Sequence, residues 1–441
     1  MTLTRRSFIT KAAVASGAAS VFRFDILKAK TVGANESVGV AFIGVGGRGA
    51  RHLTSVKDDP LVKMVAFADV DDAKAESSYK MCPSVPRFRD FRKMLDKHDK
   101  EIDAVVISTP DHTHHFPARW CLLAGKHVYV EKPLAHSVDE CRDLASLEKQ
   151  TGLACQMGNQ GHSGQGIELL EKWIEAGILG DIESLVAWNA TGKRPNAKVR
   201  PAAQPIPDTL DWDLWLGPSP EIPYNSAYCP ASWRWWFQFG HGSLGDWACH
   251  NMDAPYTALN LALPSSIKIR STGPSRYNFP EHAEIDYRFP RKGNSDISFK
   301  WYSGSEFGPE RPKDLESSRQ LGSNGGGTLI YGPKANVMMN SHASSPRIFP
   351  ESHFRELAPT LPKASKRSNH MKNWILACKG EEKTRSNFEY AAKITEVIHY
   401  GNIALHVNRD LKVDPAKGKI LSDREATKLM SSPKPRKGWK I

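Results

Sequence analysis

The stretch VGVAFIGVGGRG at residues 38–49 decides the fold of the first half of the chain. Its first six residues predict a short buried strand, and glycines follow at once. The pattern G-x-G-x-x-G is typical of the turn between a strand and a helix that binds a dinucleotide. Gly44 permits the tight turn, Gly46 lets the backbone approach a pyrophosphate, and Gly49 lets the helix pack closely on the strand. The phosphates would then lie at the N-terminus of a helix that begins near Arg48.

An acidic residue follows the next predicted strand. The apolar run at residues 62–68 ends in Asp69, which lies 20 residues after Gly49. A carboxylate at this place accepts hydrogen bonds from the adenosine ribose and repels a 2′-phosphate, so it favours NAD over NADP. The alternative is that Asp69 caps the following helix.

Apolar stretches and helical patterns alternate through residue 157. They predict strands at residues 102–108, 127–130 and 153–157, and helices at residues 116–123 and 138–150. This alternation indicates a parallel sheet, whose ligands bind at the carboxyl ends of the strands. The residues at those ends are Gly44, Asp69, Thr109 and Lys132.

The segment GDWACHNMD at residues 245–253 carries the catalytic candidates. On one continuous helix, Asp246, His250 and Asp253 share a face. A carboxylate one turn away can orient an imidazole and stabilise its charged form. We interpret His250 as the group that removes a hydroxyl proton, Asp246 as the group that orients the substrate or the imidazole, and Lys132 as the group that stabilises a developing alkoxide. A metal site built from Asp246, His250 and Asp253 is an alternative, but no further clustered ligand is evident, and we predict no metal.

A region rich in proline and tryptophan, residues 194–237, precedes this segment. Most of its tryptophans are interpreted as core and loop packing. Aromatic faces also stack on sugar rings, and Trp235 lies beside Arg234 and Trp236 just before the catalytic segment. We therefore predict Arg234, Trp236 and Asp253 as substrate-binding residues.

Four motifs together resemble one known family. They are GVGGRG (44–49), STPDHTHH (108–115), EKP (131–133) and GHGSLGDWACHNMD (240–253). The pattern is similar to the Gfo/Idh/MocA family (glucose–fructose oxidoreductase, inositol dehydrogenase, rhizopine catabolism) over essentially all of residues 38–410. EKP with the downstream D-x-x-x-H is the specific part. Asp111 departs from the pattern, because the family usually has asparagine there.

The resemblance implies a fold, a cofactor and a chemistry. It implies an α/β protein with an N-terminal Rossmann domain and a C-terminal α+β domain built on a large, open, mostly antiparallel sheet. It also implies NAD-linked oxidation or reduction of sugars, inositols and related polyols. The residues expected to bind the cofactor are Gly44, Gly46, Gly47, Arg48, Gly49, Asp69, Thr109, Pro110, His114, Glu131, Lys132 and Asn159.

The N-terminus resembles a targeting signal. Arg5 and Arg6 precede a mild apolar run at residues 12–22, as in a bacterial twin-arginine export signal. That run is too short to span a bilayer. We expect the protein to be exported folded to the periplasm without a stable membrane anchor; a chance arginine pair on a cytoplasmic protein is the alternative. The predicted domains are a signal peptide (1–34), a Rossmann domain (35–157), a substrate-binding domain (158–410) and a basic tail (411–441).

Composition excludes several classes of protein. The fractions of 40% hydrophobic and 24% charged residues are ordinary for a globular protein. Residues 1–34 contribute +5 and residues 411–441 contribute +6 to the formal charge of +12. The body is therefore nearly neutral, which argues against a nucleic-acid partner. The seven cysteines include no C-x-x-C pair, which argues against a zinc ribbon.

Three functions compete at this point. The leading one is an NAD-dependent oxidoreductase acting on a sugar, polyol or glycoside hydroxyl, with a tightly bound cofactor that is recycled in place. The second is a redox-neutral glycosidase. In it, bound NAD oxidises a sugar carbon, the aglycone is then eliminated, and NADH finally reduces the sugar to restore the ring. The third is a non-catalytic sugar-binding protein, against which the set Lys132, Asp246 and His250 argues. We expect a homo-oligomer with a small sugar or glycoside as its substrate.

Overall fold

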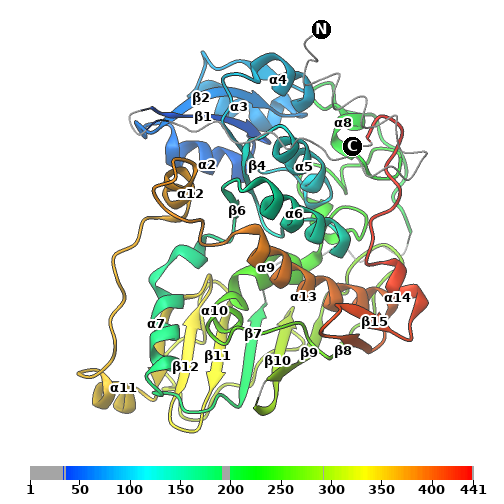
Figure 1. The fold of residues 1–441 in the computed structure, drawn as a ribbon. Coiled ribbons are helices and arrows are strands. Elements are labelled where there is room, and N and C mark those ends of the chain that lie inside the picture. Colours follow the sequence, from blue (N-terminus) through cyan, green and yellow to red (C-terminus); the bar gives the residue numbers. More distant parts are fainter. Residues whose placement is uncertain (1–32, 34–35, 191–198, 292, 440–441) are drawn as a thin grey trace.

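The structure is a computed structural model that describes residues 33, 36–190, 199–291 and 293–439. All of the predicted export signal except Gly33 lies outside the described residues. Figure 1 shows an upper α/β domain at the N-terminal end and a lower domain built on a large sheet. No helix in the described part of the chain is long and apolar enough to cross a membrane.

The upper domain is a parallel sheet between helices. Its described strands have the order β3-β2-β1-β4-β5-β6, and neighbouring strands are all parallel. This is the predicted Rossmann arrangement. The strands are β1 Val38–Ile43, β2 Val62–Ala68, β3 Arg87–Phe88, β4 Ala104–Ile107, β5 His127–Val130 and β6 Cys155–Met157. The helices are α2 Arg48–Val56, α3 Asp72–Met81, α4 Phe91–His98, α5 His115–Leu123 and α6 Val138–Thr151.

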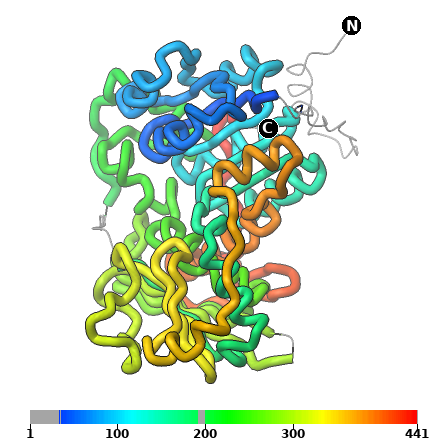
Figure 2. Tube along the Cα trace, turned by 90° about the vertical axis from the view of Figure 1, so that its left-hand side faces the viewer, coloured from blue at the N-terminus to red at the C-terminus, as the bar shows by residue number. Residues whose placement is uncertain are grey.

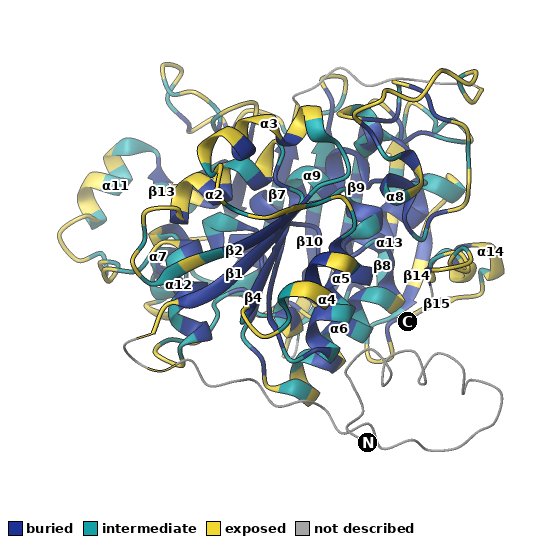
Figure 3. Ribbon diagram, turned by 90° about the horizontal axis from the view of Figure 1, so that it is seen from above, coloured by how far each residue is buried: buried dark blue, intermediate teal, exposed yellow. Residues whose placement is uncertain are grey.

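Local sequence explains these elements. All six residues of β1 and all four of β4 and β5 are buried, as expected for strands covered on both faces. Figure 3 shows β1, β2 and β4 as a mostly buried layer among the helices. The carboxylate of Asp71 accepts hydrogen bonds from the N–H groups of Ala73 and Lys74, so it caps α3. Asp69 is therefore not the cap of this helix.

The lower domain is a mixed sheet that is mostly antiparallel. Its described strands have the order β13-β12-β11-β7-β10-β9-β8-β14-β15, and only the β7–β10 pair is parallel. The strands are β7 Ser184–Asn189, β8 Ser266–Ser271, β9 Ala283–Arg291, β10 Asn294–Ser303, β11 Gly326–Tyr331, β12 Asn336–Asn340, β13 Ser344–Phe349, β14 Leu411–Asp414 and β15 Lys419–Leu421. The predicted tail therefore begins too early, because residues 411–421 complete the sheet.

Helices connect the two domains. The elements are η2 Gln160–Ser163, α7 Gln165–Glu175, α8 Trp212–Leu216, η3 Ser232–Trp235, α9 Gly242–Asn251, α10 Asp253–Ala258, α11 Glu351–Leu357, α12 His370–Cys378, α13 Phe388–Val407 and α14 Arg424–Lys428. Helix α13 packs on α6 of the upper domain and on β8 of the lower one. Figure 2 shows the chain rising from the lower domain after α11 to reach α12 beside the upper domain. There Trp374 is fully buried in the core formed with β1.

Candidate active site

A cleft of about 440 Å³ lies at the carboxyl ends of the parallel strands. Residues from β1, β2, β4 and β5 line one side, and residues from α8, η3 and α9 line the other. Most of the predicted cofactor and catalytic residues meet there. Those in the lining are Gly44, Gly46, Gly47, Arg48, Asp69, Thr109, Pro110, Glu131, Lys132, Arg234 and Asp246.

The glycine loop fits a dinucleotide. At Gly44 φ is +80°, and a Cβ there would lie 2.8 Å from the carbonyl oxygen of Ser108. A Cβ on Gly49 would lie 1.9 Å from the carbonyl oxygen of Gly44, so glycine lets α2 approach β1. Gly47 faces open space at the N-terminus of α2. The loop is therefore a backbone cradle whose helix dipole favours a phosphate.

Asp69 fixes this loop. Its Oδ2 accepts hydrogen bonds from the N–H groups of Val45 (2.8 Å) and Gly46 (3.1 Å), and its Oδ1 accepts one from Asp71 (3.0 Å). Burial raises the pKa of this carboxyl group, and the three backbone donors oppose that rise. A carboxylate has about four acceptor positions, so one remains for a ribose hydroxyl.

Lys132, Asp246 and Arg234 form a charged cluster in the cleft. The Nζ of Lys132 donates to Oδ1 of Asp246 (2.5 Å) and to its backbone oxygen (2.7 Å). The Nε of Arg234 donates to the same Oδ1 (2.7 Å). Burial raises the pKa of Asp246, but the charges of Lys132 and Arg234 outweigh it and hold that pKa well below its ordinary value. Asp246 is therefore an anion that positions two cations at the cleft.

His250 stands one helical turn after Asp246, is 2% exposed, and lies behind the cleft rather than among its lining residues. Burial, followed by the charge of Lys132, lowers its pKa well below 6.5. Its Nδ1 is buried without a hydrogen-bond partner in the described part of the chain. The ring of His342 lies 4.3 Å from the ring of His250 between centroids. The imidazole of His250 is therefore neutral at neutral pH.

Sequence reasoning missed His342, which follows β12. Its φ is +64°, in a region that residues other than glycine rarely adopt. The carbonyl oxygen of Asn251's side chain accepts a hydrogen bond from the N–H of His342 (3.1 Å). Burial and the charges of Lys132 and Arg48 lower the pKa of His342. The strained backbone holds a second neutral imidazole beside His250, and no local sequence pattern marks it.

Glu131 and His114 brace the walls of the cleft. The Nε2 of His52 (2.6 Å) and the Nε2 of Gln160 (2.8 Å) bind Oε1 of Glu131. Burial raises the pKa of Glu131, but the hydrogen bond from His52 and the charges of His52, Arg48 and Lys132 together outweigh it, and the pKa is about 2. His114 lies outside the lining; its Nδ1 is 2.8 Å from the carbonyl oxygen of Pro133, and its Nε2 is 2.9 Å from that of Thr109. It ties the ends of β4 and β5 together.

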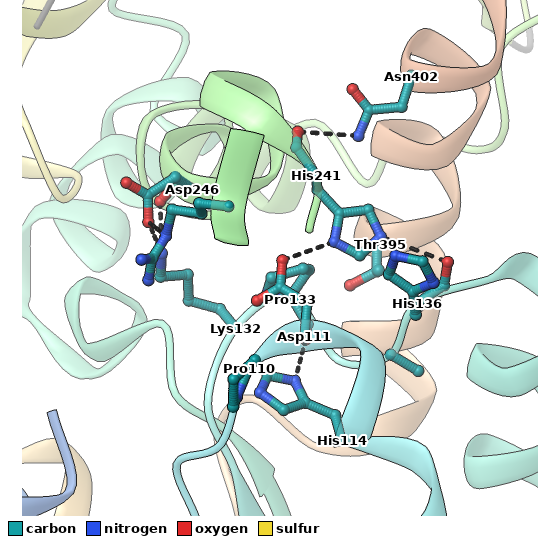
Figure 4. Close-up of polar contacts among 12 residues, drawn as sticks. Pro110, Asp111, His114, Lys132, Pro133, His136, His241, Asp246, Thr395 and Asn402 are labelled. Atoms are coloured by element: carbon teal, nitrogen blue, oxygen red, sulfur yellow. Dashed lines mark hydrogen bonds and ion pairs between the residues drawn. The ribbon is translucent and has the colours of Figure 1, made fainter. Parts of the chain in front are cut away.

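Asp111 lines the cleft and has a buried partner behind it (Figure 4). Its Oδ2 lies 2.7 Å from Nδ1 of His241, and both side chains are buried. The backbone oxygen of His241 accepts a hydrogen bond from the amide of Asn402 on α13 (3.1 Å). Burial raises the pKa of Asp111, but the hydrogen bond with His241 and the charges of His241, His114 and Arg234 together outweigh it, so the net shift is downward. The departure from asparagine thus builds a charged link between the domains.

Three predictions need correction. Asp253 lies outside the cleft and is buried between Nδ2 of Asn159 (3.0 Å), Nδ1 of His162 (2.8 Å) and the hydroxyl of Tyr390. Asn159 therefore holds Asp253 and does not line the cofactor cleft. Trp236 also faces elsewhere: its indole N–H donates to the carbonyl oxygen of Ala227 (2.9 Å), and its ring lines a separate cavity.

Other aromatic residues line the cleft in place of Trp236. They are Trp215 at the end of α8, Trp233 in η3, and Trp439 near the C-terminus. The guanidinium of Arg234 lies over the ring of Trp233, 4.3 Å from its centroid. The tryptophan-rich composition was the available signal for Trp215 and Trp233, but nothing local indicated Trp439.

The described residues contain no group of three or more His, Cys, Asp or Glu side chains that is arranged to hold a metal ion. Asp246 is occupied by Lys132 and Arg234. Asp253 is occupied by the partners already named. The alternative metal site of Asp246, His250 and Asp253 is therefore not assembled.

The fold and the cleft define a protein of the dinucleotide-binding oxidoreductase class. Residues 38–159 match the model of the oxidoreductase family with an NAD-binding Rossmann fold, and residues 165–278 match that family's C-terminal alpha/beta domain. The chain therefore belongs to the Gfo/Idh/MocA oxidoreductase family, and its first domain is the NAD-binding domain of that family.

Curated relatives match part of the chain. A glycosyl hydrolase family 109 protein from Phocaeicola vulgatus is 34% identical over 129 residues, 27% of this chain and 23% of the relative. An alpha-N-acetylgalactosaminidase from Shewanella oneidensis is 30% identical over 156 residues, 33% of this chain and 34% of the relative. The matched region thus spans only about a quarter to a third of these relatives.

Solved structures share the fold over most of the chain. A WlbA dehydrogenase from Chromobacterium violaceum, in complex with NADH and UDP-GlcNAcA, gives a TM-score of 0.61 at 15% identity and covers 89% of this chain and 99% of its own. A levoglucosan dehydrogenase in complex with NADH and L-sorbose gives 0.58 at 17% identity, covering 86% and 99%. At these identities the likeness shows the fold alone.

Proposed function

We propose that the protein is an NAD-dependent oxidoreductase that acts on a hydroxyl-bearing carbon of a sugar, polyol or glycoside. One observation carries the proposal: Lys132, held by Asp246, stands at the carboxyl edge of the NAD-binding sheet, and the neutral His250 lies one helical turn after Asp246 on α9. NAD, when bound, supplies the hydride acceptor. It would be held by the loop of Gly44, Gly46 and Gly47 and by Asp69.

The side chains then have distinct roles. His250 removes the hydroxyl proton, because its lowered pKa keeps the imidazole neutral and able to accept one. Lys132 has three N–H donors and uses two of them on Asp246, so the third is left for the substrate oxygen. Asp246 orients that ammonium group and preserves its charge. Trp233 and Trp215 offer apolar faces for the sugar ring.

The second candidate is redox-neutral cleavage of a glycoside. The relatives named as glycosyl hydrolase family 109 proteins and the related alpha-N-acetylgalactosaminidase favour it. In this reaction Lys132, Asp246 and His250 would have the same roles, and the oxidised sugar would lose its aglycone before NADH reduces it. Purified protein should be incubated with sugars and with aryl glycosides, with and without added NAD. Net NADH formation from a sugar supports the first candidate, and aglycone release without net NADH supports the second.

We also propose export of the folded protein through the twin-arginine route. The support is the pair Arg5 and Arg6 before a weakly apolar run. The variant with Arg5→Lys and Arg6→Lys should stay in the cytoplasm, as measured by fractionation. Normal periplasmic levels of this variant would refute the export signal. We propose in addition that the protein is a homo-oligomer, which light scattering on the purified chain would test.

A further inference from the structure

The C-terminal segment, residues 429–439, is anchored along the upper domain. The carbonyl oxygen of Met430 accepts a hydrogen bond from the N–H of Asp139 (3.2 Å), and the hydroxyl of Ser432 donates to Glu140 (2.7 Å). Farther on, the guanidinium of Arg436 donates to Oδ1 of Asp213 (2.6 Å) and to the carbonyl oxygen of Gly217. Figure 1 shows this segment in red, running from α14 toward α5 and α8. The segment is thus fastened at several points before it ends.

Trp439 is the residue to which these anchors lead. It is 6% exposed, and its ring packs against Phe116 of α5 with the ring centroids 5.0 Å apart. The guanidinium of Arg92, on α4, lies 4.4 Å from the centroid of the Trp439 ring and donates a hydrogen bond to the carbonyl oxygen of Gly438 (3.1 Å). A cation over an indole face is a favourable contact. The ring is therefore held in one place from two helices.

Trp439 lines the cofactor cleft at its adenosine end. Asp69, at the end of β2, marks the position of the adenosine ribose. The lining near Asp69 includes Arg89 and Phe91, which follow β3. It also includes Phe116 of α5, which follows β4, and Trp439, whose ring packs on Phe116. Lys132 follows β5, on the other side of β1 in the strand order. An aromatic wall beyond the adenosine ribose is the environment in which a purine base stacks.

The same ring also separates two spaces. A second cavity of about 970 Å³ lies beside the cleft, and Phe116 and Trp439 line both. Other residues of the C-terminal segment, from Ser431 to Pro435, line only the second cavity. Trp439 and Phe116 therefore stand between the cleft and the second cavity.

We infer that Trp439 forms the wall of the adenine subsite and that residues 429–439 act as a strap that slows release of the dinucleotide. The inference rests on the proposed function, because it assigns the cleft to NAD. The strap adds an indole to the phenyl rings of Phe91 and Phe116 that the Rossmann domain contributes to this wall. It also explains why a chain that completes its sheet at residue 421 returns to the upper domain.

The experiment compares the full chain with Trp439→Ala and Trp439→Phe. The dissociation rate of NADH is measured by displacement with excess NAD, following nicotinamide fluorescence. The affinity for ADP-ribose, which carries the adenine but not the nicotinamide, is measured by calorimetry. Loss of one base–aromatic stack predicts NADH release about tenfold faster and ADP-ribose binding about tenfold weaker for Trp439→Ala. Trp439→Phe, which keeps a ring, should stay within about threefold of the full chain.

Two controls separate a binding role from simple packing. A chain that ends at Trp439, without residues 440–441, should behave as the full chain. Arg92→Met removes the cation over the ring but lies outside the cleft lining, and it should raise NADH release by about threefold. This variant also keeps the test valid if Trp439→Ala does not fold.

The outcomes are distinguishable. If Trp439→Ala and Arg92→Met melt at lower temperatures yet release NADH and bind ADP-ribose as the full chain does, Trp439 is core packing and the inference is overturned. The proposed function would then stand. If the full chain, freed of any copurified nucleotide, binds neither NADH nor ADP-ribose, the proposed function fails and the strap fails with it.

Discussion

Lys132 has a fixed geometry that makes its role testable. Its Nζ bridges two oxygens of Asp246, and Arg234 also contacts that carboxylate. In Lys132→Met the anion therefore keeps one cationic partner, and the cleft should remain folded. We expect Lys132→Met and His250→Ala each to lower kcat by about 10²–10⁴-fold while the bound nucleotide is retained. Single-turnover kinetics and nucleotide content measure the two quantities, and near-normal kcat in either variant would remove that residue from the mechanism.

The pKa of His250 gives a pH dependence with a definite sign. Burial and then the charge of Lys132 lower this pKa below 6.5, so the imidazole is neutral and able to act as a base throughout the neutral range. The acid limb of kcat/KM should therefore lie below pH 6.5. Removing the charge in Lys132→Met should raise the pKa of His250, which NMR titration of the labelled imidazole can follow without turnover. An unchanged or lower value in that variant would contradict this placement of Lys132.

Asp69 combines a structural and a selective role. Replacement by asparagine keeps an acceptor for the N–H groups of Val45 and Gly46 but removes the negative charge that would face a 2′-phosphate. Asp69→Asn should therefore shift the ratio of NAD to NADP affinity by about tenfold toward NADP, which corresponds to about 1.4 kcal/mol. Binding titrations with both cofactors measure this ratio. Tighter binding of NADP than of NAD by the unmodified chain would show that Asp69 does not select NAD over NADP.

At the scale of elements, Gly49 determines how α2 meets β1. A Cβ at this position would lie 1.9 Å from the carbonyl oxygen of Gly44, so Gly49→Ala must push the helix away from the glycine loop. Overpacking of this kind costs about 1–3 kcal/mol. We expect a lower free energy of unfolding and weaker NAD binding, as measured by denaturant titration and calorimetry. Gly308→Ala is the matched control, because nothing lies within 4 Å of its Cβ; equal losses in both variants would refute the packing argument.

The sequence predicts the elements well where local patterns are strong. Strands β2 and β5 and helix α6 lie at the residues that their patterns indicate, to within one residue. The predicted common face of Asp246 and Asp253 does not form, because the helix is interrupted between α9 and α10. Pro255 has no N–H to donate to the carbonyl oxygen of Asn251, which accepts the hydroxyl of Thr328. The proline was visible in the sequence and was the missed signal.

Other parts of the site have no local signal. Trp233 and Trp236 lie three residues apart around a short turn and a bend, and only Trp233 lines the cleft. No periodicity applies to such a stretch, so composition alone could not choose between them. His342 and Trp439 reach the site through contacts between residues far apart in the chain, such as Trp439 with Arg92. These contacts depend on the packed domains and not on the residues nearby in sequence.

At the scale of the whole molecule, the two domains are interlocked by the path of the chain. Helix α12, which follows most of the lower domain in sequence, packs into the core cluster that contains β1. Residues 429–439 contact the other side of the upper domain, where Arg92 donates a hydrogen bond to Gly438. Asp111 and His241 add a buried link between the cleft and α9. The cofactor cleft is therefore enclosed by segments from the beginning, the middle and the end of the chain. Such a site is complete only when the entire chain has folded.

This enclosure bears on the proposed export of the folded protein. NAD and NADH are charged and confined to the cytoplasm, so an exported dehydrogenase that released NADH would stop after one cycle. We predict that NAD copurifies in near-stoichiometric amount, survives dialysis, and is regenerated in place by a second carbonyl substrate or by return of the hydride during glycoside cleavage. Denaturing the purified protein and assaying the released nucleotide tests the first part. Protein that is empty as isolated, yet turns over many times with added NAD and accumulates free NADH, would contradict both cofactor retention and the export signal.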